Sequence, residues 1–235
     1  MINSDYTRVD EATLAACIDM AASILADVCG RRGALDGRIA AIQAGKHLCG
    51  TAFTVEVRPG DNLMIHAALI LARPGDVLVI DGKASATCAL MGELMCAHAQ
   101  KAGLAGVVID GAVRDVDALR KGALPVYACA ANANGPTRTQ GGRIGYPVSV
   151  GGVTVEPGDL IVGDDDGVVV VSKHEAPTVL EAARRKIDTE ARRMHDIEAG
   201  RLLYGWLEGA LKTAGELPEG QTLNALIEAF RRVGR

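Results

Sequence analysis

The stretch GVVIDGAVRD, residues 106–115, combines a buried strand with two charged residues. Val107 to Ile109 form an uninterrupted apolar run, which is typical of a strand buried inside a sheet. The run breaks at Asp110-Gly111, and after two small apolar residues the chain places Arg114 beside Asp115. The stretch therefore predicts a core strand that delivers a cation and an anion together at its end.

The flanking sequence predicts further strands and helices. We expect strands at 74–82 and 124–130, helices at 86–103 and 116–123, and a run of short strands over 145–172. This order indicates an α/β fold with mixed sheets. From residue 175 the composition becomes helical and charged, so we expect a single α/β catalytic domain over 1–174 and a C-terminal helical extension over 175–235.

Composition excludes several classes of function. The net charge is −4 with both signs interspersed, so we expect no nucleic-acid partner. No apolar stretch reaches the roughly 20 residues of a membrane helix, and the N-terminus lacks the layout of a signal peptide. The six cysteines form no CxxC pair. We therefore expect reduced thiols in a cytoplasmic protein.

Arg114 and Asp115 are the first candidates for a functional site. Arginine is unfavourable at the start of a helix, but its guanidinium can bind a carboxylate through two hydrogen bonds. The adjacent carboxylate is a ligand type that Mg²⁺ and Mn²⁺ accept. A surface ion pair, with Asp115 as the cap of the next helix, is the alternative. These two residues alone leave both interpretations open.

The segment MGEL, residues 91–94, is the second candidate. Gly92 permits a ligand to approach the backbone closely. If a helix begins near Leu90, the free N–H groups of Leu90 to Gly92 favour a small carboxylate. The alternative is that Gly92 only allows close packing and that Glu93 is solvated.

Three other features each have a functional and a structural interpretation. His66 either lines a pocket or is a half-buried structural histidine. Arg138 and Arg143, in the loop 132–145, either read a distal carboxylate or are solvated. The acidic run 164–166 fits a turn between two strands better than a metal site.

An ordered set of motifs resembles one family. The set comprises PGDN at 59–62, PGDVLVIDG at 74–82, MGEL at 91–94, GVVIDGAVRDVDAL at 106–119, LPVYA at 124–128 and PGDLIVGDDDGVVVV at 157–171. Over roughly residues 10 to 205 the chain resembles the class II pyruvate aldolases that cleave 4-hydroxy-4-methyl-2-oxoglutarate and 4-carboxy-4-hydroxy-2-oxoadipate. That family is related to the regulator of ribonuclease activity A.

The resemblance implies roles for individual residues. Active members carry an acid, twenty intervening residues and then Arg-Asp, and Glu93 with Arg114-Asp115 matches this spacing. The family's acid is often Asp, so Glu93 departs from the pattern. By resemblance, Asp115 binds Mg²⁺ or Mn²⁺, Arg114 contacts pyruvate, and Glu93 acts on a water bound to the metal. Leu90, Met91 and Gly92 hold the substrate carboxylate, and Glu190 approaches from a neighbouring subunit.

The resemblance also implies an architecture and an activity. The expected fold is a swivelling-type layered α/β sandwich with mixed sheets, whose C-terminal helices reach a neighbouring subunit in a homotrimer or homohexamer. The expected reaction is metal-dependent cleavage of a 4-hydroxy-2-oxo acid to pyruvate and a second oxo acid, with oxaloacetate decarboxylation as a side activity. The alternatives are a non-catalytic, ribonuclease-regulator-like binding module and a dedicated oxaloacetate decarboxylase.

Overall fold

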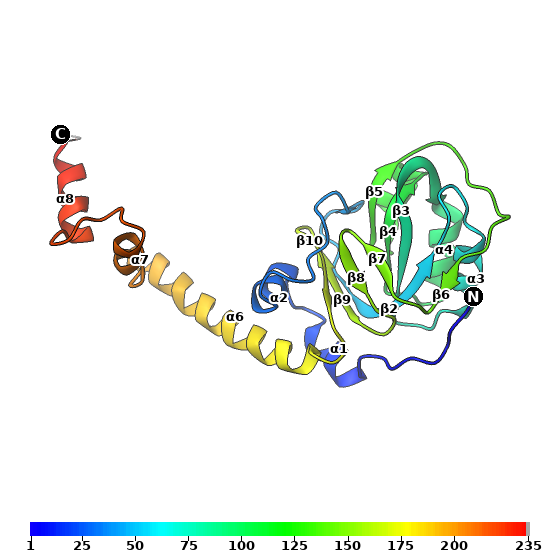
Figure 1. The fold of residues 1–235 in the computed structure, drawn as a ribbon, viewed down its shortest axis with the longest axis horizontal. Helices are drawn as coiled ribbons and strands as arrows, with labels where there is room; N and C mark the ends of the chain where they lie inside the picture. The colour runs from blue at the N-terminus through cyan, green and yellow to red at the C-terminus, as the bar shows by residue number, and fades with distance from the viewer. Residues whose placement is uncertain (234–235) are drawn as a thin grey trace. The chain divides into compact units, whose positions relative to one another are not determined.

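The computed structural model describes residues 1–233 and divides the chain into two compact units, Met1–Ile187 and Asp188–Arg235. The first unit is built on one large mixed sheet (Figure 1). Its strands are β1 (Ala40–Ala41), β2 (Leu48–Glu56), β3 (Asp76–Met91), β4 (Gly106–Val113), β5 (Val126–Ala131), β6 (Arg143–Ile144), β9 (Leu160–Asp164) and β10 (Gly167–Val171).

The strand order in this sheet is β1-β5-β4-β3-β2-β9-β10, and β6 pairs with β2. Strands β2, β3, β4 and β5 are parallel, whereas the outer pairings β1–β5, β2–β9, β2–β6 and β9–β10 are antiparallel. All eight residues of β4 are buried, as the apolar run of residues 107–109 predicted. The predicted mixed α/β fold class is therefore confirmed.

Helices cover one face of the sheet. They are α1 (Glu11–Cys17), α2 (Ala22–Val28), α3 (Leu63–Leu71), α4 (Glu93–Lys101), α5 (Val116–Lys121) and the start of α6 (Ala176–Glu198), whose buried residues all lie between Ala176 and Ala183. The core around α3, α4 and α5 contains Leu78 and Ile80 of β3, and the core around α1, α2 and the start of α6 contains Leu160 and Val162 of β9. Cys49 of β2 packs against this second core.

A small hairpin covers the opposite face. It consists of β7 (Val148–Val150) and β8 (Val153–Val155), and its valines pack with Val77 and Val79 of β3. Because successive residues of a strand point to opposite faces, Val77 and Val79 meet the hairpin while Leu78 and Ile80 meet the helices. The sheet is thus buried on both faces, which explains its continuous apolar strands.

One sequence prediction is wrong at the site itself. We expected a helix over 86–103, but residues 86–91 extend β3 and α4 begins only at Glu93. Residues 85–91 keep pairing with β4 through register shifts, for example Ala89 with Ala112 and Met91 with Val113. Strand pairing has overridden the helix propensity of this alanine-rich segment. The predicted helix at 116–123 is confirmed as α5.

The second unit contains the end of α6, together with α7 (Leu207–Thr213) and α8 (Leu223–Val233). Leu217 and Leu223 are its buried apolar residues, and the Glu208 carboxylate accepts a hydrogen bond from the backbone N–H of Leu223 at 3.0 Å. Among residues 1–233, no helix is long and apolar enough to cross a membrane.

Candidate active site

The predicted site residues of the first unit gather around one pocket of about 410 Å³. Its wall contains the end of β3, the start of α4, and the Arg114-Asp115 pair that follows β4. Of the predicted residues, the pocket is lined by Leu90, Met91, Gly92, Glu93, Arg114 and Asp115. The fold therefore brings together the two motifs that the sequence separates by twenty residues.

Asp115 connects these two motifs directly. Its backbone is left-handed, with φ 55° and ψ 37°, a conformation that Asp tolerates better than most residues. The Asp115 carboxylate does not cap its own helix, α5; instead its Oδ2 accepts a hydrogen bond from the backbone N–H of Glu93 at 3.1 Å. Asp115 thereby satisfies a free donor at the start of α4, which differs from the cap role considered from sequence.

Gly92 is required by the space around it. A Cβ atom on Gly92 would lie 2.4 Å from Oδ2 of Asp115 and 2.9 Å from Cγ of Arg114. At these distances a Cβ would force the two side chains to move, so the charged pair packs directly against the backbone at residue 92. The φ of Gly92 is −153°, which any residue can adopt, and the requirement is therefore steric.

The backbone of Arg114 is hydrogen-bonded, whereas its side chain remains accessible to solvent. Its N–H donates to the carbonyl of Met91 at 3.0 Å, and its side chain is 44% exposed. Nε of Arg114 lies 3.7 Å from Oδ2 of Asp115, which is an ion pair longer than a hydrogen bond. The guanidinium is therefore not saturated by its neighbour and can still bind an anionic ligand.

Asn62 and His66 line the same pocket, and of the two only His66 had a pocket role considered from the sequence. Asn62, which is 2% exposed, donates from Nδ2 to the Leu90 carbonyl at 2.9 Å and so holds the end of β3. His66 follows one turn later on α3. Burial and the nearby charge of Arg138 lower the pKa of His66. Asn62 is the last residue of the PGDN motif, and this position was the only sequence signal for it.

The loop 132–142 forms another wall and contributes Arg138. Asp61 anchors this loop: its Oδ2 accepts hydrogen bonds from Thr137 Oγ1 at 2.7 Å and from the Thr139 N–H at 2.7 Å. Burial by itself would raise the pKa of Asp61, but these hydrogen bonds and that from Leu63 lower it to about 2. The loop also passes Arg114, because a Cβ on Gly135 would lie 3.0 Å from Nη1 of Arg114.

The remaining candidates lie elsewhere. Arg143 pairs with Glu56, which also accepts a hydrogen bond from Lys83, so Arg143 does not line the pocket. Asp164 and Asp165 accept hydrogen bonds from the backbone N–H groups of Ala22 and Gly45, which supports a structural role for the acidic run.

Glu190 lies on α6 within the second unit, and its role at the site stays a prediction.

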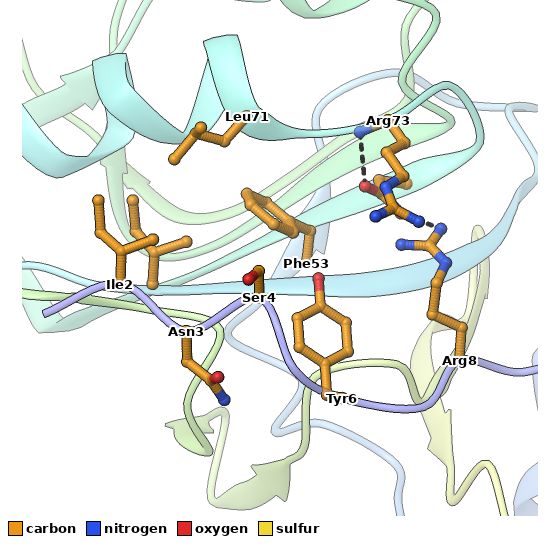
Figure 2. A pocket seen from close by; sticks show the side chains of 10 residues that line it. Ile2, Asn3, Ser4, Tyr6, Arg8, Phe53, Leu71 and Arg73 are labelled. Atoms are coloured by element: carbon orange, nitrogen blue, oxygen red, sulfur yellow. Dashed lines mark hydrogen bonds and ion pairs between the residues drawn. The ribbon is translucent and has the colours of Figure 1, made fainter.

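A smaller pocket, about 110 Å³, lies beside the N-terminal segment (Figure 2). Figure 2 shows Phe53 and Tyr6 along it, with the guanidinium groups of Arg8 and Arg73 at one end. Asp76 is fully buried there; it pairs with Arg8 and accepts a hydrogen bond from the Arg73 backbone N–H at 2.8 Å. No predicted site residue lines this pocket.

The donor set of the 410 Å³ pocket limits how it could hold a metal. Among residues 1–233, no three His, Cys, Asp or Glu side chains are grouped so that they could hold an ion. Asp115 contributes a carboxylate whose Oδ1 accepts no hydrogen bond from the described residues, and its side chain is 43% exposed. An ion here would therefore have one protein carboxylate and would take its other ligands from substrate and water.

Comparison with known proteins places the chain in a family. The model of the RraA-like family, described as Aldolase/RraA, matches residues 9–170, which include every lining residue of the 410 Å³ pocket. The chain belongs to the RraA-like family. This RraA-like protein is 41% identical over 159 residues to a Halalkalibacterium halodurans protein named "Putative 4-hydroxy-4-methyl-2-oxoglutarate aldolase", which covers 67% of this chain and 76% of that protein.

Further proteins are similar to the chain in sequence or in fold. A Burkholderia multivorans protein with the same name is 42% identical over 121 residues, covering 52% of this RraA-like chain and 73% of that protein. The structure of a Pseudomonas syringae pv. tomato protein matches with a TM-score of 0.74 at 29% identity, covering 83% and 96% of the two chains. Streptomyces coelicolor RraAS2, described as an unusual member of the RNase ES inhibitor RraA family, matches with a TM-score of 0.73 at 27% identity, covering 81% and 99%.

Proposed function

We propose that this protein is a divalent-metal-dependent lyase that cleaves a 4-hydroxy-2-oxo di- or tricarboxylic acid to pyruvate and a second oxo acid. The observation that carries the proposal is the convergence of Glu93, Arg114 and Asp115 on one pocket, with Asp115 hydrogen-bonded to the Glu93 backbone. The names of the relatives from Halalkalibacterium halodurans and Burkholderia multivorans support the same reaction class.

The residues of the pocket are compatible with Mg²⁺ or Mn²⁺. Mg²⁺ sites often use one or two protein carboxylates and keep several waters, and Asp115 supplies one accessible carboxylate. A bound ion would supply Lewis acidity at the 2-oxo and carboxylate oxygens of the substrate. We assign the metal-holding role to Asp115.

The other residues act on the substrate. Arg114 binds the 2-oxo acid end and stabilises the negative charge that develops there. Removal of the C4 hydroxyl proton, through a water, is assigned to Glu93. The C3–C4 bond then breaks, its electron pair forms the enolate of pyruvate, and protonation at C3 releases pyruvate. By resemblance, Leu90, Met91 and Gly92 hold the carboxylate; they do so from the end of β3 and the N-cap of α4, not from the first turn of a helix beginning near Leu90. Loss of CO₂ from oxaloacetate gives the same enolate, so we propose decarboxylation as a side activity.

Assembly belongs to the proposal as well. We propose a cytoplasmic homotrimer or homohexamer in which the helical extension 175–235 reaches a neighbouring subunit and Glu190 approaches its site. The family resemblance is the support for this arrangement.

The decisive experiment measures pyruvate release from 4-hydroxy-4-methyl-2-oxoglutarate and from oxaloacetate, with Mg²⁺, with Mn²⁺ and with a chelator. We expect metal-dependent turnover, reduced about 100-fold or more in Asp115→Ala. Asp117→Ala is the matched control, because Asp117 is an exposed acid two residues away that pairs with Lys121 at 2.8 Å. Metal-independent turnover, or no turnover of either substrate, would contradict the proposal.

A second candidate is a ribonuclease-regulator-like binding module. It is favoured by the structural match to Streptomyces coelicolor RraAS2. The test adds the purified protein to an RNase E-type ribonuclease and measures RNA cleavage. Inhibition that persists in Asp115→Ala, without pyruvate release by the wild type, would favour the regulator over the lyase.

A further inference from the structure

The 410 Å³ pocket has two arginines on separate segments. Arg114 follows β4, and Arg138 comes from the loop 132–142. Among residues 1–233, Arg138 makes no hydrogen bond or ion pair, whereas Arg143 is paired with Glu56. An exposed guanidinium that lines a pocket without a partner is available to a planar anion, which it can bind through two hydrogen bonds.

The neighbouring wall carries buried polar atoms that lack partners. Oδ1 of Asn62 and Nε2 of His66 are both buried, and neither is hydrogen-bonded to any described residue. Asn62 is 2% exposed, so its free oxygen cannot simply face bulk water. Buried polar atoms are normally paired, and a set of unpaired ones beside a pocket indicates a bound ligand or ordered water. Because its pKa is lowered, the neutral His66 can supply a hydrogen bond without adding charge.

The backbone at Arg138 is fixed on both sides. Thr137 and Thr139 both donate to the buried carboxylate of Asp61, which is 1% exposed, and the Gln140 N–H donates to it at 3.1 Å. The guanidinium therefore extends from a constrained point of the loop. A side chain that binds one particular group of a ligand does so more selectively when its backbone is held in place, as Asp61 holds this loop.

We propose that Arg138, with His66 beside it, forms a subsite for a second carboxylate at the distal end of the substrate. This inference rests on the proposed function, in which Arg114 and Asp115 take the 2-oxo acid end. The new element is the residue: Arg138 would give the pocket the preference for a second carboxylate that the di- and tricarboxylic substrates of the proposed function require. Arg138 is a specificity-determining residue and takes no part in bond cleavage.

The test compares two ligands of equal chain length. 2-Oxoglutarate and 2-oxopentanoate both have five carbons, and they differ only in a terminal carboxylate against a terminal methyl group. Their dissociation constants are measured by calorimetry on the full chain with Mg²⁺ present. We expect the wild type to bind 2-oxoglutarate roughly 10- to 100-fold more tightly, the difference to vanish in Arg138→Leu, and Arg138→Lys to restore part of it.

Arg120→Leu is the matched control, because Arg120 is exposed on α5 and does not line the pocket; it should retain the wild-type preference. Equal affinities in the wild type, or equal weakening of both ligands in Arg138→Leu, would overturn the subsite. If the preference depends on Arg138 but no 4-hydroxy-2-oxo acid is cleaved, the subsite stands and the aldolase function fails.

A separate observation concerns two thiols in the core around α1, α2 and the start of α6. Sγ of Cys17, at the end of α1, lies 3.0 Å from Sγ of Cys49 on β2, and both are free cysteines. Both sulfur atoms also approach the Leu14 carbonyl, at 3.2 and 3.8 Å. A disulfide requires an S–S separation of about 2.05 Å, so a shift of roughly 1 Å would suffice.

We infer that Cys17 and Cys49 form a peroxide-responsive disulfide. The contact between the two sulfur atoms lowers the pKa of Cys17 and raises that of Cys49, so we assign Cys17 as the first nucleophile. Cys17 is buried, and peroxide reaches the pair from the side of the partly exposed Cys49. Its thiolate attacks one peroxide oxygen, the O–O bond breaks, and the product is a sulfenic acid with release of water. The Cys49 thiol then displaces the second water and closes the S–S bond. In total, two thiols and one hydrogen peroxide give one disulfide and two waters.

The test exposes the full chain to hydrogen peroxide and maps cross-linked peptides by mass spectrometry without reduction. We expect a Cys17–Cys49 cross-link that a dithiol reductant reverses and that raises the melting temperature by ~5 °C. Cys17→Ser and Cys49→Ser should each abolish the cross-link and the shift, whereas Cys129→Ser should retain both. A cross-link at other cysteines, or over-oxidation of Cys17 to a sulfinic acid without a cross-link, would overturn the inference.

Discussion

Oδ2 of Asp115 lies 3.1 Å from the backbone nitrogen of Glu93. The residue proposed to hold the metal therefore also fixes the start of α4, the helix that carries Glu93, the proposed proton acceptor. This hydrogen bond couples two segments that are far apart in the sequence. Any change that moves Asp115 should therefore also release Glu93. The first two predictions follow from this coupling.

Gly92→Ala should impair the site without unfolding the protein. The new Cβ would lie 2.4 Å from Oδ2 of Asp115 and would push the carboxylate away from Glu93. Because a misplacement of about 1 Å can cost 10²-fold, we expect pyruvate release to fall at least tenfold. Gly141→Ala is the control, since a Cβ there meets nothing within 4 Å. Equal rates for the wild type and Gly92→Ala would contradict the steric argument.

Asp115→Asn and Asp115→Ala should differ in stability although both lose activity. Asparagine tolerates the left-handed conformation at φ 55° and keeps an oxygen for the Glu93 N–H. Alanine loses the helix cap and strains the backbone, which together should lower the free energy of unfolding by about 1–2 kcal/mol. Urea unfolding of the three proteins measures the difference. Identical unfolding midpoints for the two variants would show that the cap contributes nothing.

Asp61 should make the stability depend on pH in the acid range. Its pKa is about 2 in the folded protein and about 3.9 in an unfolded chain. Because the pKa is lower in the folded protein, the ionised Asp61 carboxylate makes its full contribution to the free energy of unfolding above about pH 4. This contribution is lost as the pH falls toward 2. Asp61→Asn should therefore be less stable by about 2 kcal/mol at pH 7, with a difference that shrinks below pH 4.

Urea unfolding at several pH values checks the prediction for Asp61. Asp117→Asn provides the control, because Asp117 is an exposed acid paired with Lys121. A stability difference between Asp61→Asn and the wild type that is constant from pH 7 to pH 3 would be incompatible with the ionised carboxylate as its source.

Glu190→Gln tests the role that the family resemblance gives to the helical extension. If Glu190 approaches a neighbouring site, the variant should release pyruvate at least tenfold more slowly and keep its melting temperature. Glu198→Gln, on the same helix α6, is the control. Similar rates of pyruvate release for both variants would exclude a role of Glu190 at the neighbouring site, and the other acidic residues of the extension would be tested next.

The site was partly predictable from the sequence because its two motifs each have a chemical signature. Arg114-Asp115 follows a buried strand as predicted, whereas the helix predicted over 86–103 begins only at Glu93. The exact helix start was not predictable: residues 86–91 have helix propensity, but pairing with β4 keeps them in the sheet. Asp115 caps helix α4 from a left-handed backbone conformation, which the sequence alone does not predict.

Residues outside the two motifs were harder to predict, because their roles depend on distant contacts. Arg138 and Arg143 are five positions apart in one loop and look equivalent in the sequence. Only the fold separates them: β6 brings Arg143 to Glu56 of β2, while Asp61 holds the backbone beside Arg138 at the pocket. Asn62 likewise gains its position from a hydrogen bond to Leu90 across the pocket wall.

The anchoring of the loop 132–142 has a consequence for engineering. The side chains and N–H groups that hold it to Asp61 belong to Thr137, Thr139 and Gln140, and none belongs to Arg138. Position 138 can therefore be randomised in a library while the loop keeps its shape. If Arg138 forms the proposed subsite, changing this single codon should alter which ligands bind, and the residues proposed for bond cleavage would remain unchanged.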